Sequence, residues 1–353
     1  MRKLVTVRKI TDIKPITGAD FIEEVWVDGW SVVCQKGIHK IDSFVVYFEL
    51  DSFLPESDKR FESFMKFGTR TFNGVVGHRI KTVRLKGVYS QGVIMPVSEF
   101  PELGGVLDAE RDYSEELGIV KWEAPEFTGK AGKFGDAKGN FPWFLRKTDQ
   151  ERIQNLYSKL IETHQDVDFV GTLKMDGSSI QVGYVGNERF GEPRVFLCSR
   201  NLELKYDPEA DIETQGCFIK GAVYSDLFNK AKELYDITGV SYSIQGELVG
   251  NGIQGNFEKF EDYQVFAYNI FNIDLQDYVS FHEFESLCDL VGIQTVPVVY
   301  CNQPVLRNSL QDILTLSNIQ GLKAEYAEGV VWKSAHGTIQ FKAISNKYLE
   351  KQK

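Results

Sequence analysis

A lysine and an aspartate two residues apart, in the tetrapeptide Lys174-Met175-Asp176-Gly177, are the residues of this chain best suited to chemistry. A lysine amine is a nucleophile once it has lost its proton, so Lys174 is a candidate for covalent catalysis. Asp176 can contact a hydrated cation, and Gly177 lets the backbone turn tightly and approach a ligand closely. The motif is short, and an ordinary surface turn is the alternative interpretation.

The two segments that flank the tetrapeptide have the pattern of β-strands. Residues 169–173 form an apolar run, and residues 179–185 alternate between apolar and polar side chains. Both patterns are typical of strands. We therefore expect Lys174 to lie at the mouth of a sheet, where the chain passes from one strand to the next.

Four further motifs follow in the C-terminal half. They are Ser199-Arg200-Asn201, the segment 245–250 around Glu247 with the segment 263–266 that ends at Phe266, Glu328-Gly329-Val330-Val331, and Phe341-Lys342. The ordered set resembles the covalent nucleotidyltransferase superfamily of ATP-dependent RNA ligases, DNA ligases and mRNA-capping enzymes. The resemblance covers residues 145–353. It implies that a nucleotide becomes attached to Lys174 and that the other motifs line its pocket.

The resemblance also implies a role for each acidic residue. Lys174 would attack the α-phosphorus of ATP, expel pyrophosphate and become lysyl-AMP. We expect its pKa to be lowered, because only the neutral amine attacks. Asp176, Glu247 and Glu328 would surround a Mg²⁺ or Mn²⁺ ion, largely through water. The alternative for each is a surface charge, which is weakest for Glu247 because its neighbours 244–249 are apolar.

Several residues are implied to bind the nucleotide. Phe266 would stack on adenine, with packing in the core as its alternative, and Arg200 would contact the ribose or the terminal phosphate of RNA. Leu173 stands where many relatives carry a glutamate, so backbone groups would read the adenine. The full predicted set is Thr172, Leu173, Gly177, Arg200, Glu247, Phe266, Lys342 and Lys347.

The last motif departs from the family pattern of two lysines separated by one residue. Lys342 would contact the α-phosphate, but Ile344 occupies the second position. The next lysine is Lys347, and the sequence leaves open whether it substitutes.

The N-terminal region predicts a small β-barrel. Residues 1–105 contain short β-rich runs at 5–7, 21–27, 31–33, 44–48 and 81–85, separated by turn signals. About five strands in this length suit a Greek-key barrel such as an OB-fold, and one subfamily of RNA ligases has an OB module before its catalytic domain. We predict an α+β protein: an N-terminal OB-like β-barrel followed by an antiparallel-sheet nucleotidyltransferase domain of the ATP-grasp-like ligase kind.

The predicted domains are an RNA-engaging module at 1–105, a linker at 106–143 and an adenylyltransferase domain at 144–353. The glycine-rich segment 129–135 has the wrong spacing for a phosphate loop and is interpreted as part of the linker. Residues 148–151 read as a capping box that starts an amphipathic helix. Further helices are predicted near 224–235, 281–290 and 309–317.

One basic segment stands out in an acidic chain. Residues 78–86 hold four Lys or Arg residues and no acid, whereas the whole chain has a formal net charge of −10. On one strand, Arg79 and Lys81 would share a face, and Arg84 and Lys86 the other. With Arg152, these four residues are the predicted RNA contacts. The alternative is a solvated edge strand.

Composition limits the class of protein. With 353 residues, 42% hydrophobic and 25% charged, the chain is long enough for two globular domains. It has no apolar stretch of about 20 residues that would span a membrane. Five scattered cysteines and five dispersed histidines argue against a disulfide framework and a zinc site. We expect a monomer in the cytoplasm or another reducing intracellular compartment, not a secreted protein.

The function implied is that of an ATP-dependent RNA ligase, which joins 3′-hydroxyl and 5′-phosphate ends through lysyl-AMP and RNA-adenylate and seals nicks in duplex RNA. The predicted barrel precedes the catalytic motifs, whereas DNA ligases and capping enzymes usually carry one after the last motif. One alternative is a capping-type guanylyltransferase, which GTP labelling would reveal. The other is a non-catalytic RNA-binding protein on a ligase fold, against which the complete set of motifs argues.

Overall fold

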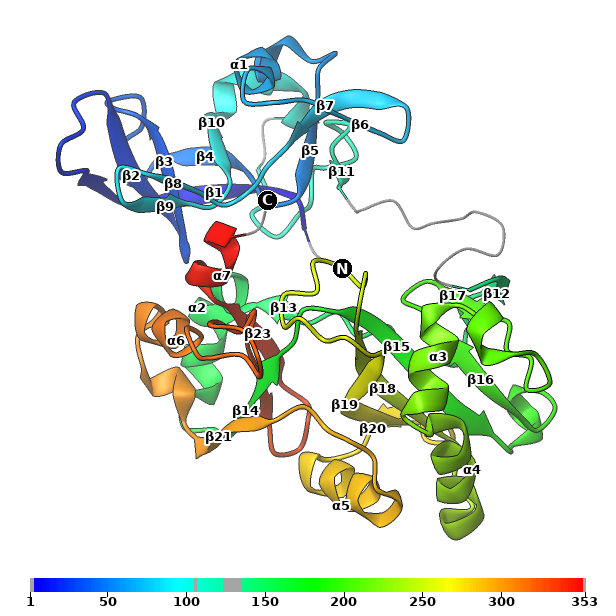
Figure 1. The fold of residues 1–353 in the computed structure, drawn as a ribbon. Helices are drawn as coiled ribbons and strands as arrows, with labels where there is room; N and C mark the ends of the chain where they lie inside the picture. Colours follow the sequence, from blue (N-terminus) through cyan, green and yellow to red (C-terminus); the bar gives the residue numbers. More distant parts are fainter. Residues whose placement is uncertain (1–2, 105–106, 123–134, 352–353) are drawn as a thin grey trace. The chain divides into compact units, whose positions relative to one another are not determined.

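A computed structural model describes residues 3–104, 107–122 and 135–351, which form two compact units (Figure 1). The N-terminal unit comprises residues 1–126 with 153–158 and 349–353, and the C-terminal unit comprises 127–152 and 159–348. Within the part of the chain that the structure describes, no helix is both long enough and apolar enough to cross a membrane.

The N-terminal unit is built on an antiparallel sheet of five strands. Their order in the sheet is β10-β4-β1-β2-β3, and their bounds are β1 (Val5–Pro15), β2 (Ile22–Val27), β3 (Trp30–Gln35), β4 (Phe44–Phe48) and β10 (Val93–Pro96). Contacts between β3 and β10 bring the two edges of the sheet together. Large apolar side chains fill the interior, including the fully buried Trp30, Tyr47 and Phe48. The result is the small barrel that the sequence predicts.

A second sheet completes this unit. Its order is β11-β5-β7-β6, with β5 (Ser52–Pro55), β6 (Arg70–Phe72), β7 (Val75–Arg79) and β11 (Val120–Lys121). A hairpin joins β8 (Val83–Leu85) to β9 (Val88–Ser90). The short helices are η1 (Lys59–Phe61), α1 (Glu62–Met65), η2 (Val97–Glu99) and η3 (Pro101–Leu103).

The predicted linker at 106–143 needs correction. Residues 107–122 belong to the N-terminal unit, since Tyr113, Leu117 and Ile119 are buried in its core and β11 pairs with β5. At the other end, β12 (Ala137–Asn140) pairs with β17 (Leu202–Leu204) of the C-terminal unit. Residues 123–134, with most of the glycine-rich segment, lie outside the described residues.

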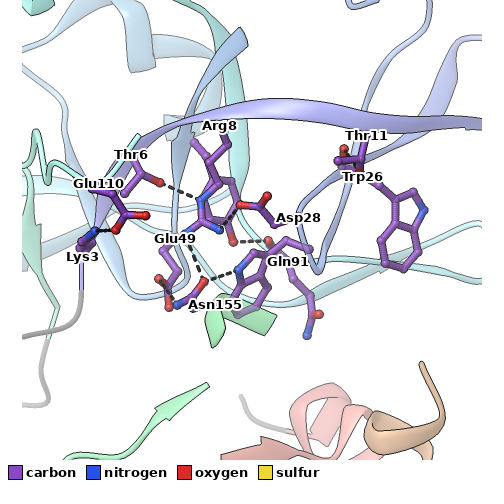
Figure 2. Close-up of polar contacts among 12 residues, drawn as sticks. Lys3, Thr6, Arg8, Thr11, Trp26, Asp28, Glu49, Gln91, Glu110 and Asn155 are labelled. Atoms are coloured by element: carbon purple, nitrogen blue, oxygen red, sulfur yellow. Dashed lines mark hydrogen bonds and ion pairs between the residues drawn. The ribbon is translucent and has the colours of Figure 1, made fainter. Parts of the chain in front are cut away.

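The first turn of α2 (Ile153–His164) is part of the N-terminal unit, and Asn155 is its polar anchor (Figure 2). Asn155 Oδ1 accepts hydrogen bonds from Trp30 Nε1 at 2.7 Å and from an Arg8 guanidinium nitrogen at 3.1 Å. Asn155 Nδ2 donates to Glu49 Oε2 at 3.1 Å. Trp30 and Glu49 are both fully buried, so this side-chain amide satisfies groups that water does not reach.

The C-terminal unit holds two sheets. The first has the order β12-β17-β16-β15-β18-β19-β20, with β15 (Ser178–Val185), β16 (Arg194–Cys198), β18 (Tyr242–Val249), β19 (Gln264–Asn272) and β20 (Asp277–Tyr278). The second has the order β13-β23-β22-β14-β21, with β13 (Glu151–Arg152), β14 (Phe169–Lys174), β21 (Val298–Gln303), β22 (Gly329–Ser334) and β23 (Gln340–Ile344). The β13–β23 pair is parallel, and the other named pairs are antiparallel.

Helices cover one face of the seven-stranded sheet, and their apolar residues share a core with it. These helices are α3 (Cys217–Tyr224), α4 (Leu227–Thr238) and α5 (Phe281–Val291). The remaining helices are η4 (Glu188–Phe190), η5 (Ile212–Thr214), η6 (Val305–Arg307), α6 (Leu310–Leu316) and α7 (Asn346–Lys351). The helices predicted near 224–235, 281–290 and 309–317 correspond to α4, α5 and α6.

One predicted capping box is wrong. Helix α2 begins at Ile153, and its N-cap residue Arg152 makes no side-chain capping bond. Glu151 and Arg152 instead form β13, which pairs with β23. The hydroxyl of Thr148 contacts Tyr268 and Ser179 in the C-terminal unit. Glu151, which the sequence pattern assigned to the start of a helix, is therefore part of a β-strand.

Candidate active site

Lys174 lies where the chain passes from one sheet of the C-terminal unit to the other. It is the last residue of β14 in the five-stranded sheet, and β15 of the seven-stranded sheet begins at Ser178. Between them, Gly177 passes close to β18. A Cβ atom on Gly177 would lie 2.4 Å from the backbone oxygen of Leu248 and 2.7 Å from Glu247 Cγ, so only glycine fits this crossing.

An ion pair fixes the amine of Lys174. Its Nζ donates to Glu328 Oε2 at 2.8 Å, and the two side chains are 20% and 17% exposed. Glu328 directly precedes β22, which pairs with β14 so that Gly329 lies opposite Lys174. Strand register therefore brings together two residues 154 positions apart in the sequence.

Two more carboxylates act on the same amine. Glu247 comes from β18 of the other sheet, where it lies opposite Ser179 of β15 and Phe266 of β19. Asp176 accepts hydrogen bonds from the Tyr348 side chain and from the Phe257 backbone. The structure thus brings all four predicted catalytic and metal-binding residues into one partly exposed cluster.

The charges of this cluster do not balance. Burial raises the pKa of Glu247 to about 8, with Glu328 and Asp176 adding repulsion that Lys174 only partly offsets. Burial and the charge of Glu328 raise the pKa of Asp176 to about 6. Three acids share one lysine, so the site holds excess negative charge whenever all of them are ionised.

The pKa of Lys174 differs from the sequence-based expectation. Burial lowers it, but Glu328, Glu247 and Asp176 together outweigh burial and hold the pKa above its ordinary value. The amine is therefore protonated at neutral pH in the ligand-free chain. A positive charge brought near the acids would weaken their hold on this proton.

The cluster fits a hydrated divalent cation better than a closed metal cage. Among the described residues, no three His, Cys, Asp or Glu side chains are arranged to ligate one ion directly. The excess carboxylate charge nevertheless favours a cation, and Mg²⁺ keeps several waters and takes few protein ligands. Glu328, Asp176 and Glu247 are the residues that would hold it.

The predicted adenine contacts are largely packed away. Thr172 and Leu173 are buried, with Thr172 Oγ1 donating to Val331 O at 3.3 Å and the Leu173 N–H donating to Pro297 O at 2.9 Å. Phe266 is 4% exposed and packs against Phe260 with ring centroids 5.7 Å apart. Phe266 therefore has the core position that we gave as its alternative, and the Leu173 N–H is already bonded.

The predicted basic contacts occupy more open positions. The exposed Arg200 donates to both carboxylate oxygens of Asp149 at 2.9 Å. Lys342 is half-buried in β23, opposite Val331 of β22. Lys347 is exposed on α7, and its Nζ lies 4.6 Å from the ring centroid of Tyr326.

Two neighbouring features escaped the sequence reasoning. The Tyr268 hydroxyl donates to Thr148 Oγ1 at 2.9 Å and contacts Ser179, which lies opposite Glu247. Lys333, five residues after Glu328, is 3% exposed and donates to Asn269 Oδ1 at 2.7 Å and to Tyr268 O, which ties β22 to β19. Burial lowers the pKa of Lys333 to about 7. The sequence offered a signal for Tyr268 alone, because Tyr268 lies two residues after the predicted site residue Phe266 on the same strand.

The loop between β18 and β19 was also missed. Its residues line an open pocket of about 590 Å³, and they include three amide side chains, two glycines, Lys259, Phe260 and Glu261. Gln254, Asn256 and Lys259 have positive φ angles of 45°, 43° and 55°, and such strain often marks functional loops. A Cβ on Gly255 of this loop would lie 3.7 Å from Asp176 Oδ2, so the pocket borders the carboxylate cluster.

The predicted RNA contacts need three corrections. Residues 79–86 are not one strand, because β7 ends at Arg79, β8 begins at Val83 and Lys86 sits in the hairpin turn with φ 49°. Arg84 pairs with Glu350 at 2.7 Å. Arg152 is only 8% exposed in β13, so it is a buried residue of the C-terminal unit and not a surface contact.

Known family models match both units. A model described as an OB-fold domain matches residues 4–97, and a model described as RNA ligase matches residues 167–349. The second match contains Lys174, Asp176, Glu247 and Glu328. No curated protein matched the chain.

Solved structures of an RNA ligase from Naegleria gruberi are similar over almost the whole length. A mutant of that ligase with ATP and Mn is 34% identical, with 99% of this chain and 99% of that chain covered and a TM-score of 0.87. The form with PPi is 35% identical, with coverages of 100% and 99% and a TM-score of 0.87. An apo mutant gives 34% identity, coverages of 99% and 98%, and a TM-score of 0.87.

These matches confirm the predicted fold class, an N-terminal OB-fold domain followed by a sheet-rich ligase domain. The RNA ligase model spans more than half of the 353 residues and encloses the carboxylate cluster around Lys174. Because that cluster, the fold and the similarity all agree, the chain belongs to the RNA ligase family.

Proposed function

We propose that this RNA ligase uses ATP and a divalent cation to join a 3′-hydroxyl end to a 5′-phosphate end in nicked RNA. The observation that carries the proposal is the position of Lys174 Nζ, held 2.8 Å from Glu328 within a cluster that also contains Glu247 and Asp176. The Naegleria ligase has been solved with ATP and Mn, which supports ATP as substrate and a divalent metal as cofactor.

In the first step, Lys174 Nζ forms a bond to the α-phosphorus of ATP while the bond to the bridging oxygen breaks and pyrophosphate leaves. The ion pair to Glu328 holds Nζ in place, and such positioning supplies much of the rate of an in-line displacement. The ammonium must first release a proton that the three acids stabilise. A divalent cation held by Glu328, Asp176 and Glu247 would offset that negative charge and neutralise phosphate charge.

Other residues of the site would bind and orient the nucleotide. Lys342 lies next to β22 in the sheet that carries Lys174, and we assign it the α-phosphate. Gly177, three residues after the nucleophile, lets the backbone pass close to β18. Arg200 would exchange its contact with Asp149 for the ribose or an RNA phosphate, since its planar guanidinium suits oxyanions. Lys347 is exposed and could reach a phosphate only from the rim.

Two further transfers would complete the reaction. The 5′-phosphate of the RNA takes AMP from Lys174 and forms RNA-adenylate, and the 3′-hydroxyl then attacks the 5′-phosphorus and releases AMP. Both are in-line substitutions at phosphorus, so the chain contributes mainly alignment and charge neutralisation. The N-terminal unit would engage the RNA, because the residues of the carboxylate cluster all belong to the C-terminal unit.

Sealing of defined RNA ends tests this proposal. The purified chain, with Mg²⁺ and either ATP or GTP, is given a nicked RNA duplex with 3′-hydroxyl and 5′-phosphate ends. We expect ATP to support sealing and RNA-adenylate to accumulate when the 3′ end is a deoxynucleotide lacking its hydroxyl. A matched nick with a 5′-hydroxyl should stay open. Labelling by GTP and not ATP would indicate a guanylyltransferase, and the absence of any sealing would contradict the proposal.

A further inference from the structure

One face of the four-stranded sheet in the N-terminal unit combines aromatic rings with cations. Phe53 of β5 lies opposite Arg79 of β7, and Arg70 of β6 lies opposite Gly77 of β7. Directly opposed residues share a face, and so do residues two apart on one strand. Arg70, Arg79 and Phe53 therefore lie on the same side of the sheet.

Three aromatic rings on this face form a row in which each ring lies near the next. The ring centroids of Phe53 and Phe72 are 5.7 Å apart, and those of Phe72 and Trp122 are 6.4 Å apart. Two guanidinium groups lie over the Trp122 ring, with Arg79 Cζ at 4.0 Å and Arg70 Cζ at 5.8 Å from its centroid. Trp122 directly follows β11, at the opposite edge of the sheet from Arg70.

The cations on this face outnumber the acid that pairs with them. Arg79 is fixed by Asp51, which accepts from its Nε at 3.0 Å and from a terminal nitrogen at 2.7 Å. Lys81 lies near both arginines. Burial lowers the pKa of Lys81, and the positive charges of Arg70 and Arg79 lower it further. Among the residues that the structure describes, Arg70, Arg79 and Lys81 therefore lie near Asp51, in a chain whose formal net charge is −10.

We infer that this face, formed by Arg70, Phe72, Arg79, Lys81 and Trp122, binds unpaired RNA. The three cations take backbone phosphates, and a base stacks on the Phe72 and Trp122 rings. Single-stranded nucleic acid is bound in this way, through cations that follow the backbone and aromatic rings that accept any base. The inference rests on the proposed function and names a surface with which the N-terminal unit holds an unpaired strand of an RNA substrate, in addition to the nicked duplex at the active site.

The same reasoning removes two residues from the RNA surface. Arg84 is paired with Glu350 at 2.7 Å and lies over the Tyr89 ring. Lys86 occupies the exposed turn between β8 and β9, away from the β5–β7 pairing that places Phe53 and Arg79 together. Arg84→Ala/Lys86→Ala therefore removes the same charge as Arg70→Ala/Lys81→Ala without touching the proposed face, which makes it a matched control.

The test measures binding of a labelled single-stranded RNA to the full chain as the salt concentration is raised. Arg70→Ala/Lys81→Ala should weaken binding about 10-fold near physiological salt and reduce the log–log salt slope by roughly 1.4, from two lost contacts at about 0.7 each. The matched control should keep the wild-type slope. Trp122→Leu should weaken binding with little change in slope, and Trp122→Phe should restore it.

Two outcomes would overturn the inference. One is a wild-type affinity and slope for a folded Arg70→Ala/Lys81→Ala variant, and the other is an equal loss in the matched control. If the face binds an acidic protein instead, an acidic polypeptide should displace the labelled RNA equally well from the wild type and from Trp122→Leu. This result would also count against RNA. Formation of lysyl-AMP by the wild-type chain is measured in a separate assay. Its absence would contradict the proposed function, whereas the salt slopes of RNA binding test only the inferred RNA surface.

Discussion

Glu49 in the N-terminal unit and Glu247 in the C-terminal unit are two carboxylates in or near protein cores, with opposite surroundings. Glu49 is fully buried and accepts from Asn155, whose own oxygen accepts from Trp30 and Arg8. Glu247 is partly exposed and shares a single lysine with Glu328 and Asp176. The first is satisfied by neighbouring donors, whereas the second belongs to a group with surplus charge.

This difference separates polar groups that hold the fold from polar groups that await a ligand. A buried polar network stabilises a protein only when its members are hydrogen-bonded, so removing one partner costs stability. A cluster of like charges costs stability as it stands, and natural proteins keep such clusters at functional sites. Mutations at Asn155 should therefore reduce stability, and mutations around Glu247 should reduce activity.

The largest effect is expected at the nucleophile. Lys174→Met should abolish the covalent nucleotide adduct and leave the melting temperature close to that of the wild type, because the side chain is 20% exposed. Lys174→Arg keeps a positive charge beside Glu328 but cannot supply a neutral amine, so it should be equally inactive. Gel detection of labelled protein measures both variants. An adduct on the Met variant would show that another residue is the nucleophile.

The next effect concerns the acids. Glu328→Gln and Asp176→Asn should each slow adduct formation by roughly 10²–10³-fold, the usual effect of losing one preorganised electrostatic group. Single-turnover rates across a Mg²⁺ titration provide the measurement. Glu213→Gln is the matched control, because it breaks an ion pair of similar length, to Lys220 at 2.7 Å, on the surface. Near-wild-type rates in the two site variants would remove those acids from the site.

A smaller effect should appear in the barrel. Asn155→Leu removes the hydrogen bonds that Asn155 makes to Trp30 Nε1 and Glu49, and should lower the free energy of unfolding of the N-terminal unit by roughly 1–3 kcal/mol. Denaturant unfolding followed by tryptophan fluorescence measures this. Asn229→Leu, at an exposed helix position, should change stability by less than about 0.5 kcal/mol. Equal stability of the two variants would mean that the Asn155 contacts do not hold the barrel.

The last effect is a pH dependence of stability in the C-terminal unit. Its acids hold protons more tightly when folded, since the pKa of Glu247 rises from 4.5 to about 8 and that of Asp176 from 3.8 to about 6. The folded chain therefore binds more protons than the unfolded chain across this window, and stability is lost as the pH rises from about 4 to about 8. Melting temperatures without divalent cation measure the loss.

Two additions sharpen that measurement. Mg²⁺ should restore more stability at pH 8 than at pH 6, because ligands that bind the folded state stabilise it and the acids are more fully ionised at pH 8. Glu247→Gln should flatten the upper part of the pH profile. A melting temperature that rises with pH through this window would contradict the charge imbalance on which the comparison rests.

The residues of the carboxylate cluster could be predicted because their motifs include the strand context. Lys174 ends one strand and Glu328 precedes its partner, so antiparallel pairing brings them together. The excess charge could not be predicted, since it depends on how deeply three acids from two sheets are buried around one amine. The raised pKa of Lys174, opposite to expectation, follows from that geometry.

Other predictions failed where alternation or sequence proximity is ambiguous. Alternation cannot distinguish a ligand-facing aromatic from a core aromatic when both faces of a strand are covered, which is why Phe266 was misplaced. The basic run 78–86 looked like one strand, but Lys86 adopts a left-handed turn conformation and splits it. Trp122 and Arg70 are far apart in sequence and meet only through the order β11-β5-β7-β6. The role of Asn155 could not be predicted from the sequence, because its partners Arg8, Trp30 and Glu49 lie in three separate segments of the chain.

The most direct test of the central claim is to locate the nucleotide on the wild-type chain. The protein is incubated with ATP labelled in the α-phosphate and with Mg²⁺, digested, and its peptides are sequenced by mass spectrometry. We predict AMP on the side chain of Lys174 alone, and loss of this AMP when pyrophosphate is added, because the first step is reversible. AMP on any other residue, or no covalent AMP on a folded chain, would contradict the account.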